Sequence, residues 1–332
     1  MKRIIAMMLV LLLALASTVS SCAQSGIRKD DKIGVVCTIF PQYDWVRQIL
    51  GGERDDVELT LLLDNKIDLH SYQPSIEDMV KISDCDLFIF VGGESDGWVD
   101  DALLRATNKD RMVLNLLEIL GESVKIEEMT EGMEAESLHS MEKETEGHEM
   151  DEDTAYDEHV WLSLKNAQRL CAAIADALST LDSDNAEAYR DNSAAYLEKL
   201  SLLDAGYQKM VNTASIKTLL FGDRFPFRYL TDDYGLAYDA AFAGCSAETE
   251  ASFETIIFLA EKIDTLGLQH ILVTESSDKR MAETIIRESK DSNRQILVLD
   301  SLQSVTSGDI ANGATYFSLM ESNLHVLEEA LH

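Results

Sequence analysis

The stretch DLFIFVG at residues 86–92 decides the fold class, because it is short, apolar and rich in residues that favour strands. Three more runs of this kind lie around it: IGVVCTIF (33–40), VELTLLL (57–63) and MVLNL (112–116). Helix-like stretches separate the runs, near residues 42–50, 75–82 and 97–105. Strands that alternate with helices predict a parallel sheet with helices on both faces.

The same alternation returns in the last part of the chain. Its strand-like runs are TLLFG (218–222), LAYDAAF (236–242), HILVTE (270–275) and QILVLD (295–300). Helix-like stretches separate most of them, and one more at 313–331 closes the chain. The sequence therefore predicts two α/β lobes, at residues 33–162 and 213–332.

Between the lobes, the sequence pattern predicts helix over almost all of residues 163–212. Its first half keeps a helical apolar period at Leu164, Ala167, Leu170, Ile174 and Leu178. A break near Asp182–Asn185 precedes a second apolar run. Because the segment holds no cluster of proline or glycine, we predict a long, rigid connecting helix rather than a flexible linker.

Residues 1–21 have the order of a secretory signal peptide. A basic start at Lys2 and Arg3 is followed by an apolar stretch over 4–16 and then by small residues. The apolar part is shorter than the roughly 20 residues that a membrane span takes. We therefore predict a cleaved signal, with an uncleaved membrane anchor as the alternative.

Cys22 follows this signal directly. The stretch Val19-Ser20-Ser21-Cys22 resembles a bacterial lipobox, although leucine is usual at its first position and glycine or alanine at its third. A lipid on Cys22 would hold the protein to the outside of the cell membrane, with residues 22–32 as an anchor linker. The alternative is an ordinary signal peptide with a nearby disulfide cysteine.

The charge and the cysteine content exclude several classes of protein. The chain of 332 residues carries a formal net charge of −32, which disfavours nucleic acid and anionic lipid as partners. Its length suffices for two domains with their own cores. The remaining cysteines, Cys37, Cys85, Cys171 and Cys245, show no CxxC spacing, so no cysteine metal site is predicted and any disulfide pairing stays open.

Residues 127–158 differ from the rest of the chain in being strongly acidic. The segment has no apolar period, which predicts a disordered surface loop. It contains His139 and His148 together with several methionines, all of which can bind transition metals. The loop is interpreted either as an antenna that gathers cations near a tighter site or as a solvated acidic loop without a role.

Several possible metal ligands follow predicted strands, where open α/β sheets bind their ligands. They are His70, Glu94, Asp223, Glu275 and Asp300. If the lobes face each other, these side chains can converge on one cleft, where imidazole and carboxylate suit zinc or manganese. The competing interpretation is that the acids cap helices and that a lone histidine lies on the surface.

Two histidine motifs resemble those of the zinc/manganese substrate-binding proteins of ABC importers. LHSYQPSIEDMVKISDCDLFIFVGG (69–93) resembles the segment with the first metal histidine, here His70, and DEHVWLSLKNA (157–167) resembles the second, here His159. The resemblance covers nearly the whole mature chain. It implies two lobes joined by a rigid helix, a metal in the cleft between them, and Asp300 as the acidic ligand.

One position departs from the family pattern. The family usually has His or Glu just before an aromatic-rich motif, and FGDRFPFRYLTDDYGL (221–236) places Arg224 there. Arginine has no lone pair to offer a cation. We predict that Asp223 supplies the missing ligand, with Glu275 or a water as alternatives. The carboxylate favours manganese, whereas the acidic loop with its histidines favours zinc, which we place first.

The resemblance implies a non-catalytic protein that captures zinc outside the cell and delivers it to an ABC transporter permease. We also expect the protein to be a monomer. A surface adhesin is the first alternative, because a lipid anchor would serve it equally. A zinc hydrolase is less favoured, since the chain holds neither HExxH nor GxSxG. Arg224 in the cleft also leaves open an anion or a chelated metal as the ligand.

Overall fold

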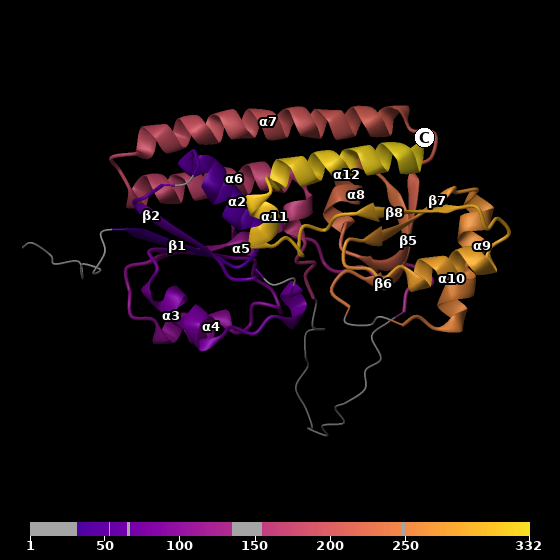
Figure 1. The fold of residues 1–332 in the computed structure, drawn as a ribbon, viewed down its shortest axis with the longest axis horizontal. Helices are drawn as coiled ribbons and strands as arrows, with labels where there is room; N and C mark the ends of the chain where they lie inside the picture. Colours follow the sequence, from indigo (N-terminus) through magenta and orange to yellow (C-terminus); the bar gives the residue numbers. More distant parts are fainter. Residues whose placement is uncertain (1–31, 53, 65–66, 135–154, 247–249) are drawn as a thin grey trace, which may run out of the picture. The chain divides into compact units, whose positions relative to one another are not determined.

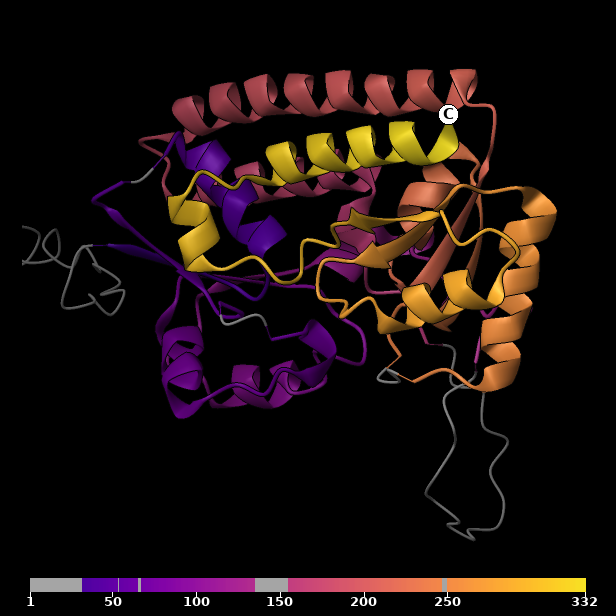
Figure 2. The same ribbon diagram turned by 45° about the vertical axis from the view of Figure 1, so that its right-hand side comes forward.

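The computed structural model describes residues 32–52, 54–64, 67–134, 155–246 and 250–332. Figure 1 follows these residues in sequence colours from indigo to yellow, and Figure 2 shows the same ribbon turned by 45°. Cys22, the predicted signal peptide and the loop histidines His139 and His148 lie outside the described residues. None of the described helices combines the length and the apolar character that a membrane span requires.

The first lobe contains a four-stranded parallel sheet, as predicted. Its strands are β1 (Ile33–Cys37), β2 (Val57–Leu61), β3 (Leu87–Phe90) and β4 (Met112–Asn115), in the order β2-β1-β3-β4. Around them lie α2 (Phe40–Leu50), α3 (Ile76–Asp84), α4 (Val99–Arg105), α5 (Leu116–Leu120) and the short 3-10 helices η1 (Leu69–Ser71) and η2 (Gly121–Ser123). All four residues of β3 are buried, which explains why its sequence contains no polar residue.

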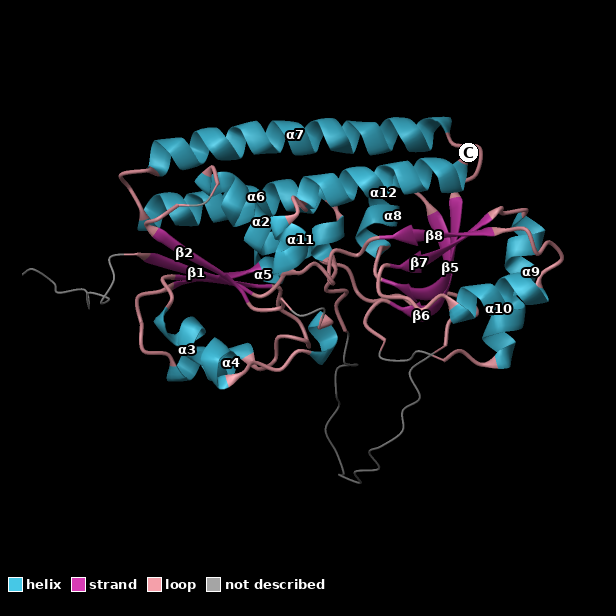
Figure 3. Cartoon of the chain, viewed as in Figure 1, coloured by secondary structure: helices cyan, strands magenta, loops and turns pink. Residues whose placement is uncertain are grey.

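The second lobe repeats this topology. Its strands are β5 (Thr218–Phe225), β6 (Ala237–Ala243), β7 (His270–Thr274) and β8 (Gln295–Leu299), in the parallel order β6-β5-β7-β8. Its helices are α8 (Arg228–Tyr234), α9 (Phe253–Leu266), α10 (Arg280–Glu288), α11 (Ser307–Ala311) and α12 (Tyr316–Leu331). Figure 3 shows both sets of strands in magenta with cyan helices around them.

The connecting segment consists of two helices, α6 (Leu164–Leu181) and α7 (Ala186–Thr213), with the turn at the predicted break. The two pack against each other, and α7 runs alongside α12 (Figure 1). Asn192 on α7 donates a hydrogen bond to the carbonyl of Ile49 in the first lobe, at 3.0 Å. Tyr234 of the second lobe donates to Asp204 on α7, at 2.7 Å. One continuous helix is therefore tied to both lobes.

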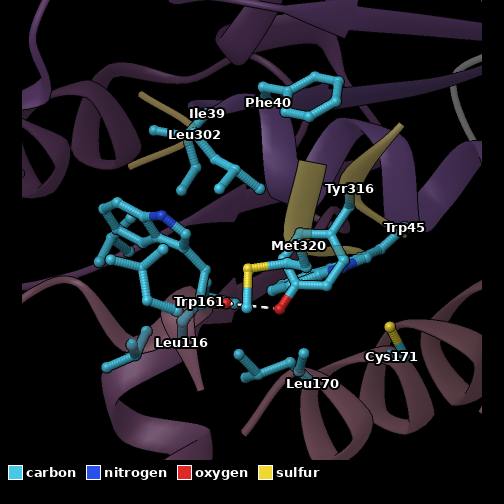
Figure 4. Packing of buried hydrophobic residues seen from close by; sticks show 14 of the residues in the cluster. Ile39, Phe40, Trp45, Leu116, Trp161, Leu170, Cys171, Leu302, Tyr316 and Met320 are labelled. Carbon is cyan, nitrogen blue, oxygen red and sulfur yellow. Dashed lines mark hydrogen bonds between the residues drawn. The ribbon is translucent and has the colours of Figure 1, made fainter. Parts of the chain in front are cut away.

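A single hydrophobic cluster extends through the first lobe, the connecting helices and part of the second lobe. At its centre the hydroxyl of Tyr316 on α12 donates to the carbonyl of Trp161 at 2.7 Å (Figure 4). Trp161 belongs to the short helix η3 (Val160–Leu162), and its ring nitrogen donates to the carbonyl of Ser301 at 2.9 Å. These buried hydrogen bonds fix the chain directly after His159.

The acidic segment differs from the prediction at both of its ends. Ile126 and Tyr156 form an antiparallel bridge, and Glu134 forms a parallel bridge with Phe242 in β6. The carboxylate of Glu134 also accepts a hydrogen bond from Thr255 on α9, at 3.2 Å. The folded protein therefore holds both ends of the acidic segment, residues 127–134 and 155–158. The contacts come from distant parts of the chain, so the local sequence could not predict them.

Candidate functional site

His70 lies on the short helix η1, in the segment that follows β2. Asp68 caps this helix, since its Oδ1 accepts a hydrogen bond from the backbone amide of His70 at 3.0 Å. The Nδ1 atom of His70 lies 2.7 Å from the hydroxyl of Ser95 and 3.5 Å from Oε2 of Glu158. With Nδ1 occupied in this way, Nε2 is the ring nitrogen that faces the site.

His159 is completely buried at the start of η3. Both its backbone amide and its Nδ1 atom lie 2.9 Å from Oδ1 of Asp157, which is buried as well. A carboxylate in contact with Nδ1 fixes the ring orientation and places the proton on that nitrogen. The lone pair of Nε2 is then available for a cation.

The structure brings the two imidazoles together although 89 residues separate them in the sequence. Their Nε2 atoms lie 3.3 Å apart, and their rings are tilted by 59°. In a tetrahedral zinc site with Zn–N bonds of about 2.0–2.1 Å, two nitrogen ligands lie about 3.3–3.4 Å apart. The observed separation therefore matches two ligands of one zinc ion.

The electrostatic surroundings favour at least one neutral imidazole. Burial and the neighbouring His159 lower the pKa of His70 to about 4, so that His70 offers a lone pair at neutral pH. Burial also lowers the pKa of His159, but the contact with Asp157 outweighs it and the net shift is upward. A cation would therefore compete with a proton for the Nε2 atom of His159.

Cys245 is the third member of this group. Among the described residues, one donor atom each of His70, His159 and Cys245 lies within 4.8 Å of the other two. Cys245 follows the end of β6 by two residues and carries a free thiol. Burial raises the pKa of this thiol, followed by the nearby carboxylate of Glu127, while the backbone amide of Glu158 opposes the rise.

The prediction of no cysteine metal site did not anticipate this arrangement. The other candidates were predicted because they are polar residues beyond the carboxyl end of a parallel strand. The same rule applies to Cys245. The absence of CxxC spacing could not exclude a metal site at Cys245, because its partners come from distant segments of the chain.

A pocket of about 340 Å³ leads to His70 and Cys245. Three carboxylates, those of Glu94, Glu127 and Glu158, also line it. Oε2 of Glu158 is buried and accepts no hydrogen bond from any described residue. An opening lined by negative charge concentrates cations at the two donor side chains.

Asp223 lies outside the group of three donors. Its Oδ2 accepts hydrogen bonds from the backbone amide and the hydroxyl of Thr274, at 2.9 and 2.7 Å, and its Oδ1 accepts from the amide of Arg224 at 2.8 Å. Nη1 of Arg224 pairs with Oδ2 of Asp68 across the lobes at 2.9 Å. Both side chains are thus engaged in structural contacts.

Glu275 and Asp300 also lie outside the group of three donors. Glu275 accepts from the amide and the hydroxyl of Ser301, each at 2.8 Å. Oδ1 of Asp300 accepts from the amide of Leu302 at 2.7 Å, and burial followed by the charge of Glu275 raises the pKa of Asp300 to about 7. The two acids line one hollow, and Glu275 shares a second, smaller cavity with Asp68 and Arg224.

The chain is similar to proteins that are named for zinc binding and zinc uptake. Residues 35–330 match the model of the family described as zinc-uptake complex component A, periplasmic. The chain is 31% identical over 300 residues to the zinc-binding lipoprotein AdcA of Streptococcus pneumoniae, covering 90% of this chain and 56% of that protein. It is 28% identical over 326 residues to the high-affinity zinc uptake system protein ZnuA of Bacillus subtilis, covering 96% and 94%.

A solved structure shows the same fold. The Zn(II)-bound ZnuA-like domain of Streptococcus pneumoniae AdcA matches with a TM-score of 0.68 and 28% identity, over 90% of this chain and 99% of that one. This chain spans little more than half the length of the AdcA relative. Since the family model covers nearly all of the described residues, the chain belongs to the zinc-uptake complex component A family.

Proposed function

We propose that this protein captures a zinc ion outside the cell and delivers it, without catalysis, to the permease of an ABC importer. The 3.3 Å separation of the Nε2 atoms of His70 and His159 carries the proposal, because it equals the distance between two nitrogen ligands of tetrahedral zinc. The zinc-binding relatives support the same cargo.

The proposal has three further parts. The signal-like residues 1–21 and the lipobox-like segment support an extracytoplasmic protein with a lipid anchor on Cys22. We also infer that the protein acts as a monomer. Asp300 remains our proposed source of a carboxylate oxygen for the cation, because it follows β8 at the carboxyl edge of the second sheet.

The rival functions make different demands on the site. A zinc hydrolase would need a bound water and a general base that turn over a substrate. A chelator-sensitive hydrolysis of esters or peptides by the purified protein would favour that reading. Replacement of the metal ligands should leave adhesion unchanged if the protein is an adhesin. The same replacement should abolish zinc-dependent growth of the cells if the protein serves transport.

The test is a competition titration of zinc against a chelator, with manganese titrated in parallel. His70→Ala and His159→Ala should each weaken zinc binding by roughly tenfold or more, which corresponds to about 1.4 kcal/mol. His325→Ala is the matched control, because His325 lies exposed on α12 and pairs only with Glu328 among the residues described. Wild-type affinity in both site variants would refute the proposed site.

A further inference from the structure

We propose that the thiolate of Cys245 is a third protein ligand of the cargo ion, beside His70, His159 and the proposed carboxylate of Asp300, and that it makes the site selective for zinc. This inference rests on the proposed function and assigns the third ligand, which Arg224 cannot supply. It follows from the placement of three donor atoms, which come from segments at residues 70, 159 and 245.

The distances suit a shared ion. With bonds of about 2.3 Å to sulfur and 2.0–2.1 Å to nitrogen, sulfur and nitrogen ligands of tetrahedral zinc lie about 3.6 Å apart. The three donors lie within 4.8 Å of one another, and the two nitrogens are already at the spacing of ligands. A movement of the sulfur of the order of 1 Å therefore suffices to complete the three-ligand set.

The local chain is built to bring this sulfur close to His159. A β-carbon at Gly244 would lie 3.0 Å from Cε1 of His159 and 2.9 Å from the carbonyl oxygen of Phe225. The absence of a side chain at Gly244 thus lets the loop after β6 approach the imidazole. Oε1 of Glu127 accepts a hydrogen bond from the backbone amide of Cys245 at 3.0 Å and holds the loop there.

The neighbouring polar side chains are less suited to the same position. The guanidinium of Arg224 offers no lone pair and pairs with Asp68. The oxygens of Asp223 accept three hydrogen bonds from Thr274 and Arg224. Cys245, in contrast, offers a donor atom that lies within 4.8 Å of both imidazoles.

A thiolate ligand determines which metal the site prefers. Binding converts the thiol of Cys245 to a thiolate, and its proton leaves to solvent, so that the charge of the ion is partly neutralised. Thiolate and imidazole ligands favour zinc, whereas manganese prefers carboxylate, carbonyl and water. The site should therefore bind zinc well and discriminate against manganese.

The experiment uses cobalt(II) as a spectroscopic probe of the purified protein, together with zinc and manganese competition titrations. Wild type should show a near-ultraviolet sulfur-to-cobalt charge-transfer band, and Cys245→Ser should lose it. Zinc affinity of Cys245→Ser should fall by at least about 10–100-fold. Cys171→Ala is the matched control, because Cys171 is a free, buried thiol in α6 outside the donor group and its loss should leave both readouts unchanged.

Folding is checked by circular dichroism and thermal unfolding of the metal-free proteins. Cys245→Asp provides a second variant, which should lack the band and shift the zinc-to-manganese affinity ratio toward manganese. A wild-type protein without the band, or a Cys245→Ser variant with wild-type zinc affinity, would overturn the proposal. If His70→Ala still weakens binding in that case, the proposed function stands and only the cysteine ligand fails.

Discussion

Replacing Asp157 with asparagine should weaken zinc binding without removing a ligand. Oδ1 of Asp157 lies 2.9 Å from both the amide and Nδ1 of His159. Asparagine keeps the shape and can still accept both hydrogen bonds, so the change removes mainly the negative charge. A neutral acceptor polarises the imidazole less and lowers the basicity of its Nε2 atom.

The loss of zinc affinity in Asp157→Asn should be large because the contact between Asp157 and His159 is buried. Asp157 is only 2% exposed, and water therefore screens its charge little. Hydrogen bonds to a charged acceptor are about twice as strong as those to a neutral one. Loss of a carboxylate behind a metal-bound histidine costs about 10–100-fold in affinity, or about 1.4–2.7 kcal/mol.

The measurement is a chelator competition titration at pH 7, with the unfolding midpoint of the metal-free variant as a control for folding. Asp157→Glu, which keeps the charge but moves it by one methylene, separates charge from position. An Asp157→Asn protein that folds normally and binds zinc as tightly as wild type would show that Asp157 does not act through His159.

Two further predictions concern buried and paired charges around the site. Burial raises the pKa of Asp96 to about 7, so the folded protein binds a proton that the unfolded chain releases above pH 4. The contribution of this one carboxyl to the free energy of unfolding should therefore fall by about 4 kcal/mol between pH 4 and 7. Asp96→Asn should flatten this decline in urea unfolding, and an equal pH dependence in both proteins would contradict the assignment. Arg224→Met removes the ion pair with Asp68 and should lower the free energy of unfolding by about 1 kcal/mol while leaving zinc affinity at or above the wild-type value. A loss of affinity as large as that of His70→Ala would show that the guanidinium supports the metal site.

The fold was predictable because the buried parallel strands are largely apolar. DLFIFVG at 86–92 contains β3, and HILVTE at 270–275 contains β7. The α6–α7 turn fell at the predicted break, since Asp182 and Asn185 interrupt the apolar period. These features depend on local patterns, and local patterns can be read from one sequence.

The site could be predicted only in part. His70 and His159 stand in motifs with a recognisable spacing, and the structure brings their rings together. Cys245 has no such motif, because its neighbours are set by how the loop after β6 meets the first lobe. Asp223 looked equally suitable in sequence, but Thr274 on the adjacent strand takes up one of its oxygens. Tertiary partners of this kind leave no local signal.

The two imidazoles are anchored unequally. His159 is completely enclosed, its ring rests on a carboxylate, and Trp161 behind it is fastened by hydrogen bonds to two other segments. His70 sits on a three-residue helix, is partly open to the pocket, and leans on a hydroxyl. An ion bound between them would have one rigidly held ligand and one more mobile ligand. During release of the ion, the bond to His70 should therefore break first and the bond to His159 last.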